Sequence, residues 1–190
     1  GRHTEGARAV ATHTGALAGS DAVYDAAFRR AGLLRVLDMD ELFSAAETLA
    51  HLQASHGHRL AILTNVGGLA VLAVDRLIAL GGELASISEE VKKSLDKVLP
   101  SRWSGANPID ILGDADGARY AQATDLVLGD TANNALLVMN SPNTLASPIE
   151  SAKAVVDTIR KHRAEHYSRK PVFAAWVGDS GEASAAFGAA

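Results

Sequence analysis

The sequence predicts an α/β protein with a doubly wound parallel sheet, that is, a parallel sheet covered by helices on both faces. Short apolar runs that suit buried strands alternate along the chain with longer segments of helical periodicity. Serine or aspartate precedes many of the helical segments and glycine follows several of them, which marks where helices start and stop. With 47% hydrophobic residues in a chain of 190, we expect one large domain, or one domain with part of another.

The composition excludes several classes of protein. The formal net charge of -4 argues against a dedicated nucleic-acid binder, which usually carries a basic stripe. The chain contains no cysteine, so disulfides and thiolate chemistry are excluded. No apolar run is long enough to span a membrane and no signal peptide is recognised, so we expect a cytoplasmic protein without nucleic-acid or membrane partners. Because the chain starts at Gly1 rather than methionine, we expect it to be a piece of a longer protein.

Residues 1–54 are expected to belong to a first domain. A loop of small residues, Thr12 to Gly15, precedes a helix that Ser20 or Asp21 can cap and that Gly32 ends. This loop is the first candidate for a functional segment.

The same domain continues with a short predicted strand at Leu33 to Val36 and a second helix. Asp38 caps this helix, and Glu41 follows three residues later in a capping-box arrangement. A polar stretch from Gln53 to His58 then predicts a linker, so residues 58–190 form the second predicted domain.

The second domain begins with a continuous apolar run, Leu60 to Leu63, which is typical of a strand buried on both faces. It leads into Asn65 to Gly68 and then into a helix that extends to Leu80. The segment from Trp103 to Gly113 is expected to be a loop. Further strands are predicted at 84–87, 135–139 and 171–177, and further helices at 88–99, 117–128 and 148–163.

The loops that follow the strands all lie at the carboxyl edge of a parallel sheet, which is where doubly wound proteins bind their ligands. In this chain they are Asn65 to Gly68, Ser141 to Ser147 and Gly178 to Gly181. We therefore expect the ligand site at this edge.

His13 is the candidate nucleophile. Its small neighbours Thr14 and Gly15 allow an anion to approach the backbone and supply amide and hydroxyl donors. A largely neutral imidazole can accept a phosphoryl group and pass it on. The plainer alternative is a loop histidine in a glycine-rich turn, and composition alone favours that alternative.

The segment Asn65, Val66, Gly67, Gly68 follows a strand and starts a helix. Free amides and the positive end of the helix dipole at such a position stabilise a phosphate or a phosphohistidine. The segment lacks both the Gly-Lys-Ser/Thr of a Walker A loop and the dinucleotide Gly-x-Gly-x-x-Gly pattern. An ordinary tight turn between strand and helix remains the alternative.

His162 and His166 lie four residues apart and can share one helix face. A metal site needs further ligands, and none is apparent. We predict no metal site in this chain.

Several ordered motifs together resemble one known family, the NDP-forming acyl-CoA synthetases, which are relatives of succinyl-CoA synthetase. Thr12 to Asp21 looks like the phosphohistidine loop of the ADP-forming acetyl-CoA synthetases, and the residues from Ala22 to Val36 continue the match. Leu63 to Ala70 resembles the start of the family's flavodoxin-like CoA-ligase domain. Asn107 to Asp110 resembles its Asn-Pro-(Val/Ile)-Asp signature.

The resemblance implies a domain order. Residues 1–54 correspond to the tail of the second, succinyl-CoA synthetase-like domain, and residues 58–190 to the third, flavodoxin-like CoA-ligase domain. A Rossmann-type CoA-binding domain would precede Gly1, and an ATP-grasp domain would lie elsewhere in the polypeptide or on a partner subunit. The 190 residues alone are therefore not expected to complete a turnover.

The resemblance also implies a reaction, the formation of acyl-CoA from a carboxylate through an acyl phosphate and a phosphohistidine. CoA, phosphate, and ATP or ADP with Mg²⁺ on the ATP-grasp domain would take part, and His13 would carry the phosphoryl group. The predicted phosphate-binding residues are Thr14, Gly15, Asn65, Gly67 and Gly68.

A second branch of the same family offers an alternative function. Arg30 to Leu52 and Ser141 to Trp176 resemble the synthetase-like region of GNAT-fused protein lysine acetyltransferases, which respond to acyl-CoA without making it. Members of that branch often lack the histidine. Because His13 is present, the sequence favours the synthetase.

Overall fold

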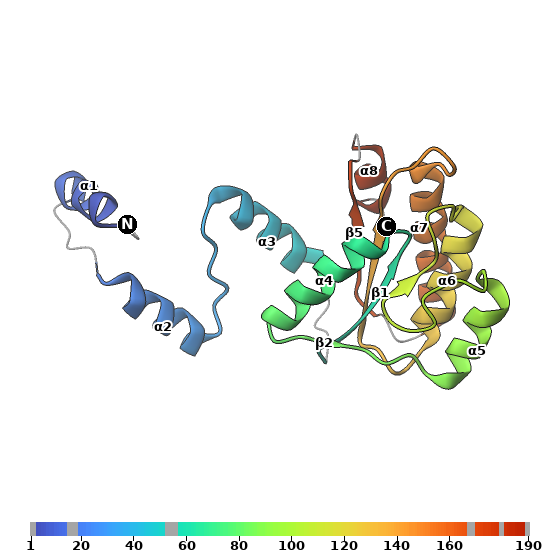
Figure 1. Cartoon of the computed structure of the whole chain (residues 1–190). Helices are drawn as coiled ribbons and strands as arrows, with labels where there is room; N and C mark the ends of the chain where they lie inside the picture. Colours follow the sequence, from blue (N-terminus) through green and yellow to red (C-terminus); the bar gives the residue numbers. More distant parts are fainter. Residues whose placement is uncertain (1–2, 15–18, 52–56, 167–169, 179–180, 189–190) are drawn as a thin grey trace. The chain divides into compact units, whose positions relative to one another are not determined.

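The computed structural model describes residues 3–14, 19–51, 57–166, 170–178 and 181–188 (Figure 1). The chain divides into two compact units, residues 1–52 and 53–190. We call them the first and second unit and describe each by itself.

The described residues of the first unit form the helices α1 (Thr4–Thr14), α2 (Asp21–Ala31) and α3 (Met39–His51) (Figure 1). The sequence did not predict α1. Thr12, His13 and Thr14, expected in a loop, form its last residues, so that part of the prediction was wrong. Three alanines at alternate positions from 7 to 11 favour helix and extend it through these residues. Gly15 lies outside the described residues.

Local signals correctly predicted the ends of α2 and α3. Gly32 ends α2 in the left-handed conformation, with φ 66°. At the start of α3, Asp38 Oδ1 accepts the amide of Glu41 at 2.8 Å, and the Glu41 carboxylate accepts the amide of Leu37 at 2.6 Å. The strand predicted at Leu33 to Val36 is irregular backbone instead, because the described part of this unit contains no strand with which it could pair.

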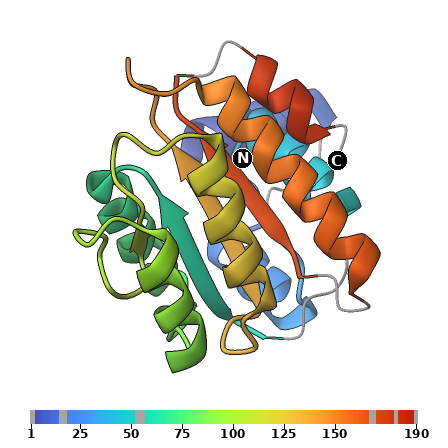
Figure 2. The ribbon, with the colours of Figure 1, turned by 90° about the vertical axis from the view of Figure 1, so that its right-hand side faces the viewer.

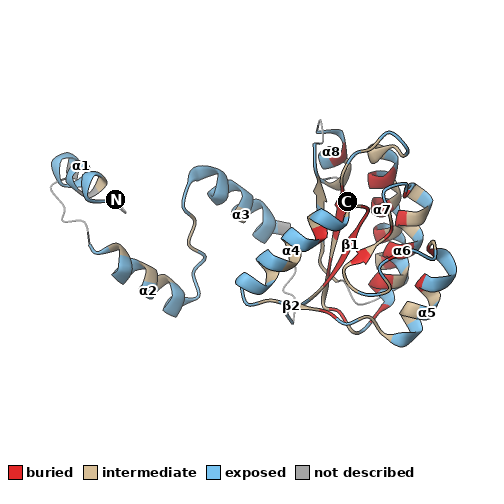
Figure 3. Cartoon of the chain, in the orientation of Figure 1, coloured by how far each residue is buried: buried red, intermediate tan, exposed pale blue. Residues whose placement is uncertain are grey.

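The described residues of the first unit form no buried core. None of them is buried (Figure 3), and several of the large apolar ones are exposed. Val23, Leu34 and Phe43 are each about two-thirds exposed. Exposed apolar helix faces of this kind require further residues to cover them.

The second unit is built on a parallel sheet with the strand order β2-β1-β4-β5, and a fifth strand, β3, pairs with β1. Every pairing in it is parallel, as predicted. The strands are β1 (Arg59–Thr64), β2 (Glu83–Leu84), β3 (Ile109–Asp110), β4 (Ala135–Asn140) and β5 (Val172–Trp176).

Helices cover both faces of this sheet, which confirms the doubly wound fold. Helix α4 (Gly67–Ala79) lies on one face. The opposite face carries α5 (Glu89–Val98), α6 (Gly117–Gly129), α7 (Pro148–Glu165) and α8 (Glu182–Gly188) (Figure 2). The main core lies between this second group and the sheet, and includes Leu63, Leu95, Ile109, Tyr120, Leu136, Val138 and Val155.

Three elements of the second unit differ from the prediction. β2 contains only Leu84 of the strand predicted at 84–87, and β3 lies within the segment predicted as a loop. Helix α8 was not predicted, although glutamate and alanines at 182–186 favour helix.

The two short strands β2 and β3 lie beside the same edge of β1, one near its start and one at its end. The carboxamide of Asn107 fills the gap between them. Its Oδ1 accepts the amide of Ile62 at 2.9 Å, and its Nδ2 donates to the carbonyls of Leu60 at 2.9 Å and Ala85 at 2.8 Å. Asn107 thus replaces the backbone of a missing strand residue and holds the edge together.

Tyr120 anchors α6 to the end of β4. Its buried hydroxyl donates to the carbonyl of Met139 at 2.9 Å and accepts from Nδ2 of Asn140 at 3.1 Å. Burial raises the pKa of Tyr120 well above that of an exposed tyrosine because it penalises the charged form.

Replacing Tyr120 with phenylalanine is expected to lower the free energy of unfolding by about 1–2 kcal/mol at neutral pH, because the Met139 carbonyl loses its donor. The raised pKa adds a pH dependence: above about pH 10 an unfolded tyrosine loses its proton while the folded one keeps it. The wild type therefore loses stability as the pH rises from 9 to 11 more steeply than the variant. Denaturation midpoints at both pH values measure this difference, and parallel losses would contradict it.

Candidate functional site

Three loops meet at the carboxyl edge of the sheet, following β1, β3 and β4. Asn65, which is only 2% exposed, joins two of them. Its Nδ2 donates to the carbonyl of Ser141 and its Oδ1 accepts the Ser141 amide, both at 2.9 Å. The predicted phosphate ligand Asn65 therefore has both polar atoms of its carboxamide engaged in holding the loop after β1 against the loop after β4.

The start of α4 is open to solvent and has no side-chain cap. Val66 occupies the N-cap position and provides no side-chain acceptor, while Gly67 and Gly68 are exposed. The first amides of a helix have no partner within the helix, so this end can bind an anion. The structure thus places the two predicted phosphate-binding glycines at a helix N-terminus, as the sequence indicated.

Asp110 lies next to this helix start. A Cβ atom added to Gly67 would lie 3.1 Å from Oδ2 of Asp110, so a larger residue at position 67 would crowd the carboxylate. The other oxygen, Oδ1, accepts the amide of Leu112 at 2.9 Å. Asp110 therefore links the start of α4 to the loop that follows β3.

The neighbouring helices α6 and α7 start at the same edge but carry side-chain caps. Asp116 accepts the amide of Arg119 at 2.9 Å, and Ser147 accepts the amide of Glu150 at 3.4 Å. The two starts are close together, because a Cβ on Gly117 would lie 3.2 Å from the carbonyl oxygen of Glu150.

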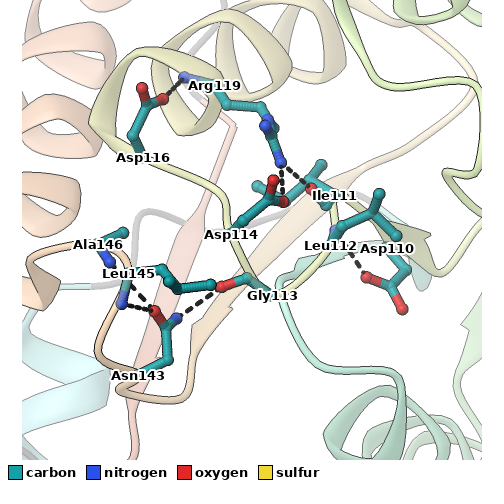
Figure 4. A network of polar contacts seen from close by, with 10 residues as sticks. All are labelled: Asp110, Ile111, Leu112, Gly113, Asp114, Asp116, Arg119, Asn143, Leu145 and Ala146. Atoms are coloured by element: carbon teal, nitrogen blue, oxygen red, sulfur yellow. Dashed lines mark hydrogen bonds and ion pairs between the residues drawn. The ribbon is translucent and has the colours of Figure 1, made fainter.

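The loops after β3 and β4 form one polar network (Figure 4). Nη1 of Arg119 donates to the carbonyl of Ile111 at 3.0 Å and to Oδ1 of Asp114 at 2.6 Å, and this hydrogen bond lowers the pKa of Asp114. Nδ2 of Asn143 donates to the carbonyl of Gly113 at 2.6 Å. The network fixes the two loops to each other and to α6.

A pocket of about 620 Å³ opens beside this network, lined by Arg102, Leu112, Gly113, Asp114 and Leu145. Leu112 adopts φ 71°, a left-handed conformation that is unusual for leucine. Leu145 is 75% exposed. Leu145 lies in the loop Ser141 to Ser147 that the sequence placed at the ligand edge, whereas Arg102, Leu112, Gly113 and Asp114 were not predicted; the signature Asn107 to Asp110 just before Leu112 was the nearest signal to them.

His13 lies in the last turn of α1 and is exposed. The C-terminal end of a helix is the negative end of its dipole, so a phosphoryl group on His13 would gain no stabilisation from α1. Such a group would need amide donors or cations from other elements. Thr14 ends α1, and Gly15 lies outside the described residues.

The pair His162 and His166 forms contacts within the fold. The rings stack at a centroid distance of 4.1 Å, and His162 Nδ1 lies 3.6 Å from Oδ1 of Asp125. Among the described residues, no group of three or more His, Cys, Asp or Glu side chains could hold a metal ion.

None of the helices in the described ranges has the length and apolar character needed to cross a membrane.

The fold and the edge geometry define a class: a doubly wound domain that presents an uncapped glycine-rich helix start and a pocket at the carboxyl edge of its sheet. Residues 60–187, more than half of the chain, match the family model of the Ligase-CoA domain. Residues 1–49 match that of the succinyl-CoA ligase-like flavodoxin domain. The chain belongs to this family, the NDP-forming acyl-CoA synthetases related to succinyl-CoA synthetase, as the sequence motifs predicted.

Two curated relatives show which proteins the chain is similar to. It is 37% identical over 178 residues to subunit alpha of the ADP-forming acetate–CoA ligase I of Pyrococcus furiosus, covering 94% of this chain and 37% of the relative. It is 34% identical over 163 residues to the ADP-forming 4-hydroxybutyrate–CoA ligase of Nitrosopumilus maritimus, covering 86% of this chain and 23% of the relative. The chain thus spans well under half of each protein.

A solved structure shows the same fold. The acetyl-coenzyme A synthetase 1 of Ca. Korarchaeum cryptofilum, described as dinucleotide forming and in complex with phosphate and ADP, superposes with a TM-score of 0.87 at 35% identity. The match covers 98% of this chain and 39% of that one. Nothing in these comparisons supports the acetyltransferase alternative.

Proposed function

We propose that this chain is part of an NDP-forming acyl-CoA ligase that works through an acyl phosphate and a phosphorylated His13. The observation that carries the proposal is the uncapped start of α4, where Gly67 and Gly68 expose helix amides at the ligand-binding edge of the sheet. Family membership supports the same activity, since the relatives described above are named as ADP-forming CoA ligases.

The proposed reaction has three reversible transfers. A phosphate oxygen attacks the thioester carbonyl of acyl-CoA, the carbon–oxygen bond forms, the carbon–sulfur bond breaks, and CoA leaves as a thiolate that takes up a proton. An imidazole nitrogen of His13 then attacks the phosphorus, and the carboxylate leaves. Finally a terminal oxygen of the nucleoside diphosphate attacks the phosphohistidine, and the nitrogen–phosphorus bond breaks.

Each predicted residue has a role in this scheme. His13 is the nucleophile, and the amides of Gly67 and Gly68 stabilise the negative charge of the transferred group. The sequence motif predicts Thr14 and Gly15 as further donors for the phosphoryl group, and Asn65 contributes by holding the loop that precedes α4.

Other parts of the protein would supply the remaining components. A Rossmann-type domain would bind CoA, and an ATP-grasp domain, in the same polypeptide or a partner subunit, would bind the nucleotide with Mg²⁺. We place the reaction in the cytoplasm.

Labelling the full-length protein with ATP carrying a radioactive γ-phosphate tests this proposal. We expect a label on the protein that acid releases and alkali does not, because phosphohistidine is acid-labile. ADP should remove the label, and so should a carboxylate together with CoA.

The result also separates the two branches of the family. An acyl-CoA-responsive region of an acetyltransferase would bind acyl-CoA without forming a labelled protein or any nucleotide-dependent CoA ligation. A full-length protein that binds acyl-CoA but incorporates no label under these conditions would overturn the ligase proposal.

A further inference from the structure

We infer that Leu112 and Leu145 form the wall that receives the acyl group, and that this group is an aliphatic chain longer than acetyl. This inference rests on the proposed function and adds the substrate class and two specificity-determining residues to it. It depends on four observations: the conformation of Leu112, the exposure of Leu145, the charges around the pocket and its position at the edge of the sheet.

The backbone of Leu112 indicates that its side chain has a use. With φ 71° it adopts a conformation that glycine takes without strain and leucine does not. Two hydrogen bonds hold the segment in place: Asp110 Oδ1 accepts the Leu112 amide, and Asn143 donates to the carbonyl of Gly113. Strain of this kind concentrates at ligand-binding positions, and here it directs a leucine to the pocket.

Leu145 is exposed on a loop that is held in a defined conformation. Oδ1 of Asn143 accepts the amides of Leu145 at 2.8 Å and Ala146 at 3.1 Å, and Asn143 Nδ2 is bound to Gly113. The loop therefore keeps Leu145, which is 75% exposed, at the pocket that Leu112 also lines. An apolar ligand would remove both side chains from water.

The charges around the pocket suit the anionic end of such a ligand. Asp114 is hydrogen-bonded to Arg119 at 2.6 Å and also lies in the field of Arg102, so two guanidinium groups face one carboxylate beside the pocket and Arg102 lines it. A carboxylate or an acyl phosphate would be attracted to the guanidinium of Arg102.

The pocket is also connected to the start of α4. Asp110 binds the Leu112 amide with one oxygen and lies beside Gly67 at the start of α4 with the other. The pocket has a volume of about 620 Å³ and is widely open to solvent. An acetyl group offers a single methyl to this apolar wall, whereas a longer chain offers several carbons that the two leucines can remove from water.

The test compares kcat/KM of the full-length enzyme for acetate, butyrate and hexanoate. We expect the wild type to prefer butyrate or hexanoate to acetate. Leu145→Ala and Leu112→Gly should each lower the ratio of hexanoate to acetate activity at least tenfold, since losing apolar contacts weakens the longer acid selectively. Leu112→Gly also relieves the backbone strain, so this variant should fold.

Leu72→Ala is the matched control, because Leu72 is a leucine exposed to a similar degree, 66%, and does not line the pocket. It should leave the ratio unchanged. The acyl-wall assignment would be overturned if the ratio of hexanoate to acetate activity were unaltered in both pocket variants, or if the wild type preferred acetate. In either case, ATP-dependent labelling of the protein would still support the ligase proposal. Absence of labelling, and of ligation with any of the acids, would end both proposals.

Discussion

Replacing His13 with asparagine in the full-length protein is expected to abolish both the acid-labile label from ATP and the formation of acyl-CoA. Asparagine keeps a polar side chain of similar size but has no nucleophilic nitrogen that can carry a phosphoryl group. Because every phosphoryl group must pass through this residue in the proposed scheme, turnover should fall by about three orders of magnitude or more. Labelling with radioactive ATP and a coupled assay of CoA ligation measure the two losses.

His3→Asn provides the control for this experiment. His3 lies just before α1 and is exposed, as His13 is, so its replacement tests the loss of an exposed histidine in the same region. We expect normal labelling and ligation in this variant. Equal labelling of the wild type and His13→Asn would show that another residue carries the phosphoryl group.

Replacing Asn107 with alanine is expected to destabilise the second unit by about 2–4 kcal/mol. The substitution removes three hydrogen bonds to the backbone of the sheet edge. It also leaves the amide of Ile62 and the carbonyls of Leu60 and Ala85 without these partners. Each lost bond to a partly buried backbone group costs about 1 kcal/mol, and more where the group stays dry.

Chemical denaturation followed by tryptophan fluorescence measures the loss of stability in Asn107→Ala. The chain has two tryptophans, Trp103 and Trp176, and both lie in the second unit. Asn134→Ala is a suitable control: Oδ1 of Asn134 accepts from Arg59 in an exposed position, where water can replace the lost bond. If the two variants unfold at the same denaturant concentration, the carboxamide of Asn107 does not replace a strand residue as described.

Elements whose signals are local were predicted well. Asp38 caps α3 by accepting the Glu41 amide as predicted, and Glu41 reaches back to the amide of Leu37, one residue before the N-cap. Ser88 accepts the amide of Val91 at the start of α5, and Ser147 with Pro148 starts α7. These signals act over three or four residues, so the chain contains them before any tertiary contact forms.

Elements that depend on distant partners were predicted poorly. β3 consists of two residues and exists because Ile109 and Asp110 pair with Leu63 and Thr64. The predicted strand at Leu33 to Val36 has strand-like residues but no partner in the described part of its unit. β propensity depends on the pleated surface that a strand joins, and a single segment does not reveal that surface.

The candidate site shows the same division. The sequence identified Gly67 and Gly68 as the start of a helix at the carboxyl edge, because an apolar strand and a glycine pair are local features. It could not show that Asp110 lies beside Gly67, nor that Leu112 takes a left-handed conformation. Those features arise where loops from different strands meet.

The sequence by itself determined the α/β class, the order of most elements, the family and the candidate nucleophile His13, because periodicity, caps and motifs are properties of short segments. The tertiary structure alone decided that Asn65 bonds to Ser141, 76 residues away, and that Asn107 completes the edge beside Ile62, 45 residues away. Hydrogen bonds over such separations form only after the sheet has brought its strands together. The physical reason is that a parallel sheet aligns the ends of strands that lie far apart in the chain.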